Sequence, residues 1–146
     1  MDLTSVYRFL EKPQSIDHEI LRIRQKIAAL RGCLLPQGIR YDIDKVQTSP
    51  EDRMSRINAE IADLNARIDA LLDDKAEAVR RISLAIESLD DDRERNVLSL
   101  YYVGRKTMRE IERELHYSKR WTIKLKRAGV TKLSQRVHLS APSDVL

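Results

Sequence analysis

Hydrophobic residues recur at alternating intervals of three and four through two long stretches of the chain. This spacing places apolar side chains on one side of a helix and is the heptad pattern of a coiled coil. The second stretch opens with Ser49-Pro50 and two acidic residues, a sequence typical of a helix N-terminus. The apolar positions are Ile16, Ile20, Ile23, Ile27, Leu30 and Leu34 in the first stretch, and Ile57, Ile61, Leu64, Ile68 and Leu71 in the second.

The two stretches predict an all-α protein with a long antiparallel helical hairpin, a coiled-coil arm over residues 14–89. We expect the first helix to begin at Ser15 and the arm to turn through a loop at 36–50. A short helix should precede the arm in residues 1–13, beginning near Thr4 or Ser5 and interrupted by Pro13.

The two arm helices differ in length, about 30 Å against about 60 Å if the second runs to Leu89. Beyond Leu71 we expect its apolar stripe to shift to Leu72, Val79 and Ile86, joined by Ile82 and Leu89. This half has no partner within the hairpin. Either a second copy covers it in a homodimer, or residues 1–12 and the C-terminal domain cover it in a monomer.

Residues 90–138 predict three short helices, followed by a loose tail at 139–146. The acidic run before Arg93 should cap a helix over 91–103 that ends at Gly104. Thr107 and Glu110 form a capping box, and Ser118 offers a second N-cap shortly afterwards. Two capped helices joined by about three residues have the spacing of a helix-turn-helix, whose second helix enters the DNA major groove.

The last helix has a buried side and a basic side. Thr122, Leu125, Gly129 and Leu133 recur at intervals of three and four, which marks the buried side. Gly129 lies in mid-helix at a cost of about 1 kcal/mol relative to alanine, and a close helix contact would explain it. The residues left pointing outward or sideways are Lys119, Arg120, Trp121, Ile123, Lys124 and Arg127.

Positive charge is concentrated in this C-terminal part. Between Arg93 and His138 there are 13 Lys and Arg against 4 Asp and Glu, whereas the whole chain has a net charge of only +4. A basic domain beside an acidic arm is typical of a nucleic-acid-binding protein.

We therefore expect a double-stranded DNA site on the helix-turn-helix. Lys119, Arg120 and Lys124 should face the groove, while Arg105, Lys106, Thr107 and Arg127 hold backbone phosphates. Ser118, Trp121 and Ile123 complete the predicted DNA-binding set.

Motifs for catalysis are absent from the sequence. It has no glycine-rich phosphate loop, cysteine pair, His-Glu metal spacing or nucleophile elbow, so we expect no enzyme, cofactor or metal. Lone Cys33 fits a reducing compartment, and no apolar run is long enough to cross a membrane. These features predict a soluble cytoplasmic protein.

Two parts of the sequence resemble known families. RERNVLSLYYVGRKTMREIERELHYSKRWTIKLKRAGVTKL resembles the fourth region of primary sigma factors, although Trp121 and Ile123 replace polar or basic residues there. RGCLLPQGIRYDIDKVQTSPEDRMSRINAEI, followed by a long helix and that domain, resembles the ArpU-like late-transcription regulators of phages and prophages. The resemblance implies a regulator of late genes in a bacterial host, with RNA polymerase as a further partner.

Two other functions remain open at this point. A small terminase subunit also joins a helix-turn-helix to a helical oligomerisation arm, and ring formation in solution would identify it. Alternatively, the C-terminal domain is a protein module that docks on polymerase and contacts DNA only secondarily.

Overall fold

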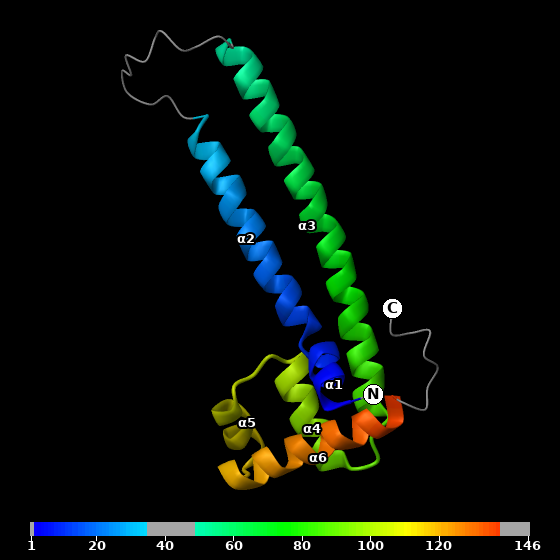
Figure 1. Ribbon diagram of the computed structural model, residues 1–146. Helices are drawn as coiled ribbons and strands as arrows, with labels where there is room; N and C mark the ends of the chain where they lie inside the picture. The colour runs from blue at the N-terminus through cyan, green and yellow to red at the C-terminus, as the bar shows by residue number, and fades with distance from the viewer. Residues whose placement is uncertain (1, 35–48, 138–146) are drawn as a thin grey trace. The chain divides into compact units, whose positions relative to one another are not determined.

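The computed structural model describes residues 2–34 and 49–137, and every regular element in these ranges is a helix, which confirms the predicted all-α class. Most of the expected 36–50 loop and the expected 139–146 tail lie outside the described residues. The helices are α1 (Leu3–Leu10), α2 (Lys12–Gly32), α3 (Pro50–Glu87), α4 (Asp92–Leu98), α5 (Met108–Leu115) and α6 (Lys119–Val137), and a π-helical segment, η2 (Ser99–Val103), continues α4 (Figure 1).

The chain forms two compact units, and α3 contributes to both. Residues 14–74 make a two-helix unit, and residues 1–13 together with 75–146 make a head unit. This division differs from the predicted one, which assigned residues up to 89 to the arm. The last turns of α3 belong to the head unit because their apolar residues pack in its core.

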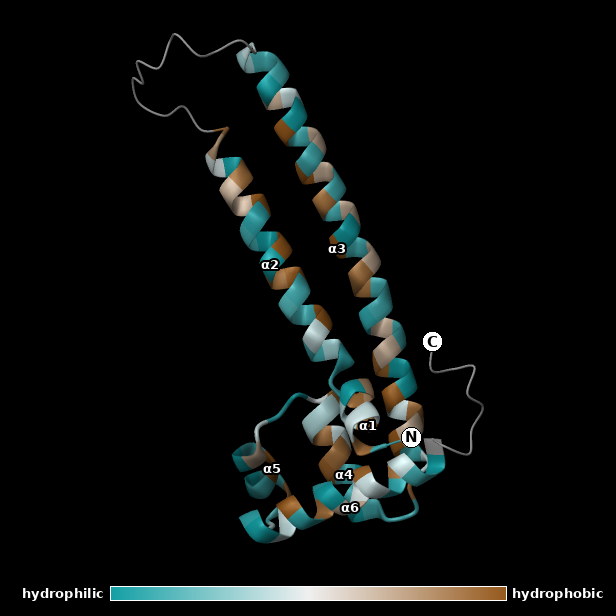
Figure 2. Cartoon of the chain, in the orientation of Figure 1, coloured by the Kyte–Doolittle hydropathy of each residue, from teal (hydrophilic) through white to brown (hydrophobic). Residues whose placement is uncertain are grey.

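In the two-helix unit, every residue of both predicted seams belongs to one hydrophobic cluster or packs against it. The hydrophobic residues of α2 and α3 in this unit lie on facing sides (Figure 2). Glu19 pairs with Arg67 at 3.1 Å and Lys26 with Glu60 at 3.6 Å. Partner numbers fall along α3 as they rise along α2, so the two helices run antiparallel.

The helix starts agree only partly with the expected ones. The Ser49 hydroxyl accepts a hydrogen bond from the Asp52 amide at 3.1 Å, as expected for the start of α3. The expected start of α2 at Ser15 is wrong, because the helix begins at Lys12. Pro13 lies in its first turn, where the missing proline N–H costs no intrahelical bond. Helix α1 begins one or two residues before the expected start, with Asp2 as its cap.

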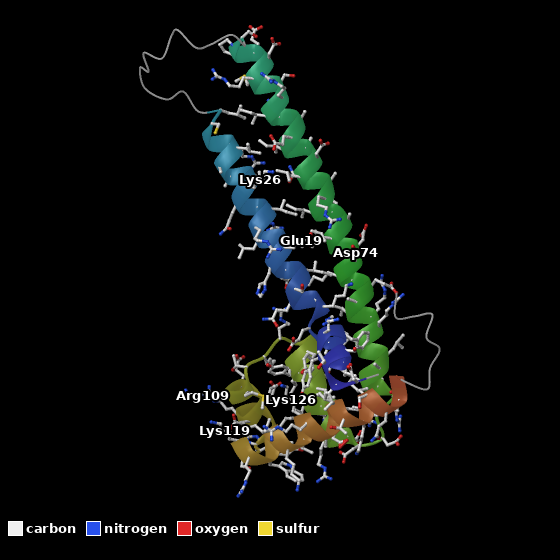
Figure 3. All side chains as sticks on the ribbon, in the orientation of Figure 1. Glu19, Lys26, Asp74, Arg109, Lys119 and Lys126 are labelled. Carbon is white, nitrogen blue, oxygen red and sulfur yellow. The ribbon has the colours of Figure 1, made fainter. Side chains whose placement is uncertain are left out.

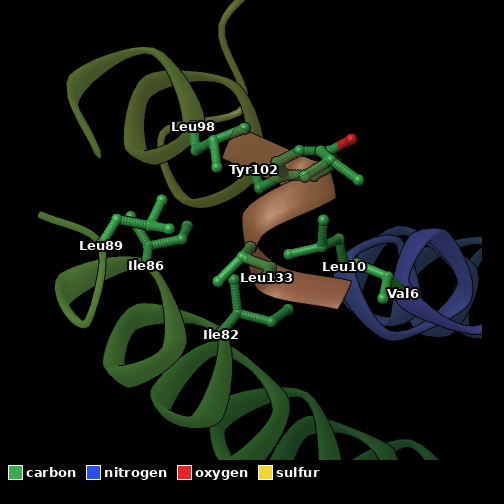
Figure 4. Packing of buried hydrophobic residues seen from close by; sticks show 9 residues of the cluster. Val6, Leu10, Ile82, Ile86, Leu89, Leu98, Tyr102 and Leu133 are labelled. Carbon is green, nitrogen blue, oxygen red and sulfur yellow. The ribbon is translucent and has the colours of Figure 1, made fainter. Parts of the chain in front are cut away.

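The main core of the head unit joins four parts of the chain. Val6 and Leu10 of α1 meet the end of α3, the α4–η2 segment and α6 (Figure 4). The buried members are Val6, Leu10, Ile82, Ile86, Leu89, Leu98, Tyr102, Val130 and Leu133.

The apolar stripe of α3 beyond Leu71 agrees only partly with the expected one. Ile82, Ile86 and Leu89 are buried as expected, whereas Leu72 is 43% exposed and Ala78, which continues the original heptad register, is buried. Packing of Ile82 and Leu89 against α1 and α6 covers this part of the stripe within one chain. Because this part of the stripe is covered within one chain, it gives no support to a homodimer through the arm.

Helix α6 approaches α4 closely at Gly129. A Cβ atom at this position would lie 2.7 Å from Cδ1 of Leu98 and 3.6 Å from Cβ of Glu94. Thr122, Leu125 and Leu133 are buried with Gly129, as the spacing predicted. The expected close helix contact is therefore present.

An ion pair lies beside this contact. The Glu94 carboxylate is only 3% exposed, and the Lys132 ammonium donates to both of its oxygens at 2.6 and 2.8 Å. The ion pair offsets part of the desolvation cost of the buried carboxylate and joins α6 to α4.

The segment between α4 and α5 departs from the expected helix over 91–103. Asp91 caps α4 as expected, but the last turns are π-helical. Gly104 has φ −76°, and Arg105 takes the left-handed conformation with φ 57°. The helical segment nevertheless ends at Gly104, as expected.

Replacement of Gly129 by leucine should destabilise the head unit. Leucine forms helices well, so the loss would come from overpacking against Leu98, at about 1–3 kcal/mol. Chemical denaturation measures it. Gly32→Leu is the matched control, since nothing lies within 4 Å of a Cβ there. Equal stabilities of the two variants would disprove the close contact.

Candidate nucleic-acid interface

Helices α5 and α6 are joined by a short turn with two side-chain caps. The Thr107 hydroxyl accepts from the Glu110 amide at 3.2 Å, and a Glu110 carboxylate oxygen accepts from the Thr107 amide at 3.4 Å. These two bonds confirm the predicted capping box. His116 ends α5 in the left-handed conformation, and the Ser118 hydroxyl accepts from the Trp121 amide at 3.1 Å.

The outward side of α6 carries exposed cations. Thr122 and Leu125 are buried, and this fixes the opposite side of the helix toward solvent. Lys119, Arg120, Lys124 and Arg127 are exposed, and none of them forms an ion pair within residues 2–34 and 49–137. The arrangement leaves positive charge available to an anionic partner.

Two more exposed cations lie on α5. Arg109 and Arg113 are four residues apart and have no ion pair in the described part of the chain. Arg109 on α5 and Lys119 at the start of α6 lie at the same end of the head unit (Figure 3). We call Arg109, Arg113, Lys119, Arg120, Lys124 and Arg127 the basic face.

Sequence reasoning missed the α5 part of the basic face. The signal was present, because Ile111 and Leu115 mark the packing side of α5 and leave the other side outward. Arg109 and Arg113 lie on that outward side.

Of the two cations expected just before α5, Lys106 is less available to a partner. Lys106 is partly buried and pairs with Glu114 at 3.2 Å, so its charge is partly neutralised within the head unit. Arg105 is exposed and is held in the left-handed backbone conformation.

Thr107 and Ser118 act as helix caps. The Thr107 hydroxyl accepts from the Glu110 amide and donates to the Glu110 carboxylate at 3.0 Å, so its hydrogen is already used. These bonds lower the pKa of Glu110 below its ordinary value of 4.5, led by the side-chain bond from Thr107. In this structure both hydroxyls position α5 and α6.

Trp121 is half-buried at the edge of the basic face. It packs against the cluster of Val97, Ile111 and Leu125. The Arg93 guanidinium lies 5.3 Å from the ring centroid and the Lys124 ammonium 5.6 Å. Cation–π attraction therefore holds cations of α4 and α6 beside one ring. No sequence pattern links Arg93 with Trp121, because the contact crosses between helices.

Lys126 points away from the basic face into a group of tyrosines. Its ammonium lies 4.3 Å from the Tyr101 ring centroid, 5.6 Å from Tyr102 and 5.9 Å from Tyr7. Burial lowers the pKa of Lys126 and raises the pKa of Tyr102. This lysine therefore links α6 to α1 and η2.

Comparison with family models, curated proteins and solved structures gave no match. Among the described helices, none has the length and hydrophobicity needed to cross a membrane.

Loss of the capping box should destabilise the head unit. Thr107→Ala removes the cap of α5 and should cost about 1 kcal/mol at neutral pH. Because the pKa of Glu110 is lowered in the folded protein, its contribution to folding stability is present above pH 4.5. This contribution is lost as the pH falls through the lowered pKa. The difference between wild type and variant in thermal melts should therefore narrow in acid.

Thr131→Ala is the control for this experiment. Thr131 is an exposed threonine in the middle of α6, and its hydroxyl donates to the Arg127 carbonyl at 2.9 Å. Alanine should be tolerated there because it favours helix. A Thr131→Ala loss as large as that of Thr107→Ala would contradict the assigned cap.

Proposed function

We propose that this protein is a sequence-specific regulator of transcription that binds double-stranded DNA through the basic face. Helix α6 enters the major groove, and α5 lies across the phosphate backbone. One observation carries the proposal: Lys119, Arg120 and Lys124 are exposed and free of carboxylate partners in the described residues, on a capped helix that follows a tight turn.

The chemistry of these side chains fits a duplex. Lysine and arginine neutralise phosphates and release condensed counterions, which supplies most of the sequence-independent affinity. Arginine and lysine also bind the O6 and N7 acceptors of guanine in the major groove. We assign base contacts to Lys119, Arg120 and Lys124, and phosphate contacts to Arg127 and the α5 arginines.

The biological setting of the proposal comes from the sequence. The resemblance to ArpU-like regulators and to the fourth region of primary sigma factors supports late genes of a phage or prophage as the target. RNA polymerase of the bacterial host is the protein partner that this setting implies.

Arg120→Ala should weaken binding to the preferred duplex and relax its sequence preference. A lost bidentate guanine contact costs about 1–3 kcal/mol, which is about 5-fold to 150-fold in the dissociation constant. Fluorescence anisotropy with a duplex recovered by genomic-fragment selection measures the change. Arg127→Ala should instead weaken all duplexes alike and reduce the log–log salt slope by about 0.9.

Arg22→Ala is the matched control for charge. Arg22 is an exposed arginine of α2 with no ion pair among the described residues, and it lies outside the basic face. Its loss should leave affinity and salt slope nearly unchanged. Unchanged binding by Arg120→Ala, or equal losses for Arg22→Ala and Arg120→Ala, would refute the proposed interface.

A further inference from the structure

Ile123 is an apolar side chain surrounded by cations on the surface of α6. Positions three and four residues away are its neighbours on a helix, and three of them carry cations of the basic face: Lys119, Arg120 and Arg127. Ile123 is partly exposed.

The core of the head unit does not account for Ile123. In the part of the chain that the structure describes, it belongs to none of the three hydrophobic clusters and does not pack against them. Trp121 differs, since its ring packs on the third cluster and holds two cations. Ile123 is therefore the apolar group of the basic face that remains available to a partner.

The flanking charges restrict what that partner can be. An apolar protein surface would have to desolvate the neighbouring cations, which is costly. In a DNA major groove the cations meet phosphates and base acceptors, while the C5 methyl group of thymine offers an apolar contact. Duplex RNA lacks that methyl group and has a major groove too narrow for a helix.

We infer that Ile123 reads thymine, packing its side chain against a C5 methyl group in the major groove. The inference rests on the proposed function and adds the base that α6 recognises beside its guanine contacts. It assigns the preference to an apolar contact, distinct from the hydrogen bonds of Arg120 and Lys124. The predicted site therefore contains a thymine next to a position read by a cation.

The test is a double-mutant cycle in which a protein substitution is combined with a base substitution in the DNA. A duplex selected by the wild-type protein from a random-sequence pool is resynthesised with deoxyuridine in place of each thymine in turn. At one position the loss of the methyl group should weaken wild-type binding about fourfold, the effect of burying one such group. Ile123→Ala should bind the thymine duplex more weakly and show no further loss with deoxyuridine.

Two variants serve as controls. Ile123→Val keeps a branched apolar group and should retain most of the discrimination between thymine and deoxyuridine. Leu84→Ala truncates an exposed leucine of α3 and should behave as wild type in both duplexes. Circular dichroism and thermal melting check that Ile123→Ala is folded, as expected for a residue outside the core.

The outcomes separate this inference from the proposed function. Tight, sequence-selective binding with no effect of deoxyuridine at any position would overturn the inference and leave the function standing. Equal deoxyuridine losses for wild type and Ile123→Ala would also overturn it, because another group would then read the methyl. Failure to retain any duplex in the selection would overturn the proposed function itself.

Discussion

The close approach of α6 to α4 at Gly129 is the constraint on which the head unit depends. The Leu98 side chain of α4 packs directly on Gly129 and occupies the space that a Cβ there would need. With Gly129 against α4, the helical period places Thr122, Leu125 and Leu133 inward as well. The remaining side of α6 must then face solvent, and that side carries the cations of the basic face.

Several carboxylates of the head unit form ion pairs with cations outside the basic face. Glu94 binds Lys132, Glu114 binds Lys106, and Asp90 binds Arg136 at 2.6 Å. Glu110 is used in the capping box. A carboxylate within pairing distance of the basic face would reduce its attraction for phosphate. The acidic residues thus fix the fold and leave the basic face positive.

Features set by local sequence could be predicted, and contacts between distant segments could not. The capping box at Thr107, the Ser118 cap and both heptad seams follow from spacing alone. The start of α2 is harder to predict, because Ser15 offers a cap while Pro13 is equally compatible with a first helical turn. The π-helical turns after Leu98 have no sequence signature and were missed as well.

The same distinction between local and long-range features explains the errors in the predicted packing. The stripe of α3 beyond Leu71 was predicted only in part: Ile82, Ile86 and Leu89 are buried as expected, whereas Leu72 is exposed and the small residue Ala78 is buried. The lysine among the tyrosines could not be foreseen, because Tyr7 and Lys126 are far apart in sequence. Within the candidate interface, the outward residues of α6 could be predicted from the spacing of its buried residues. The contact of Arg93 with Trp121 could not be predicted, because it joins two different helices.

Amide hydrogen exchange with and without a selected DNA duplex tests the central claim most directly. The claim is that the buried residues of α6 anchor one side of the helix in the core, so that the opposite side is exposed and binds DNA. Exchange should slow on duplex addition across the first half of α6 and the start of α5, and remain unchanged along α2 and the first half of α3. Protection confined to α2 and α3, with α5 and α6 unaffected, would contradict the account.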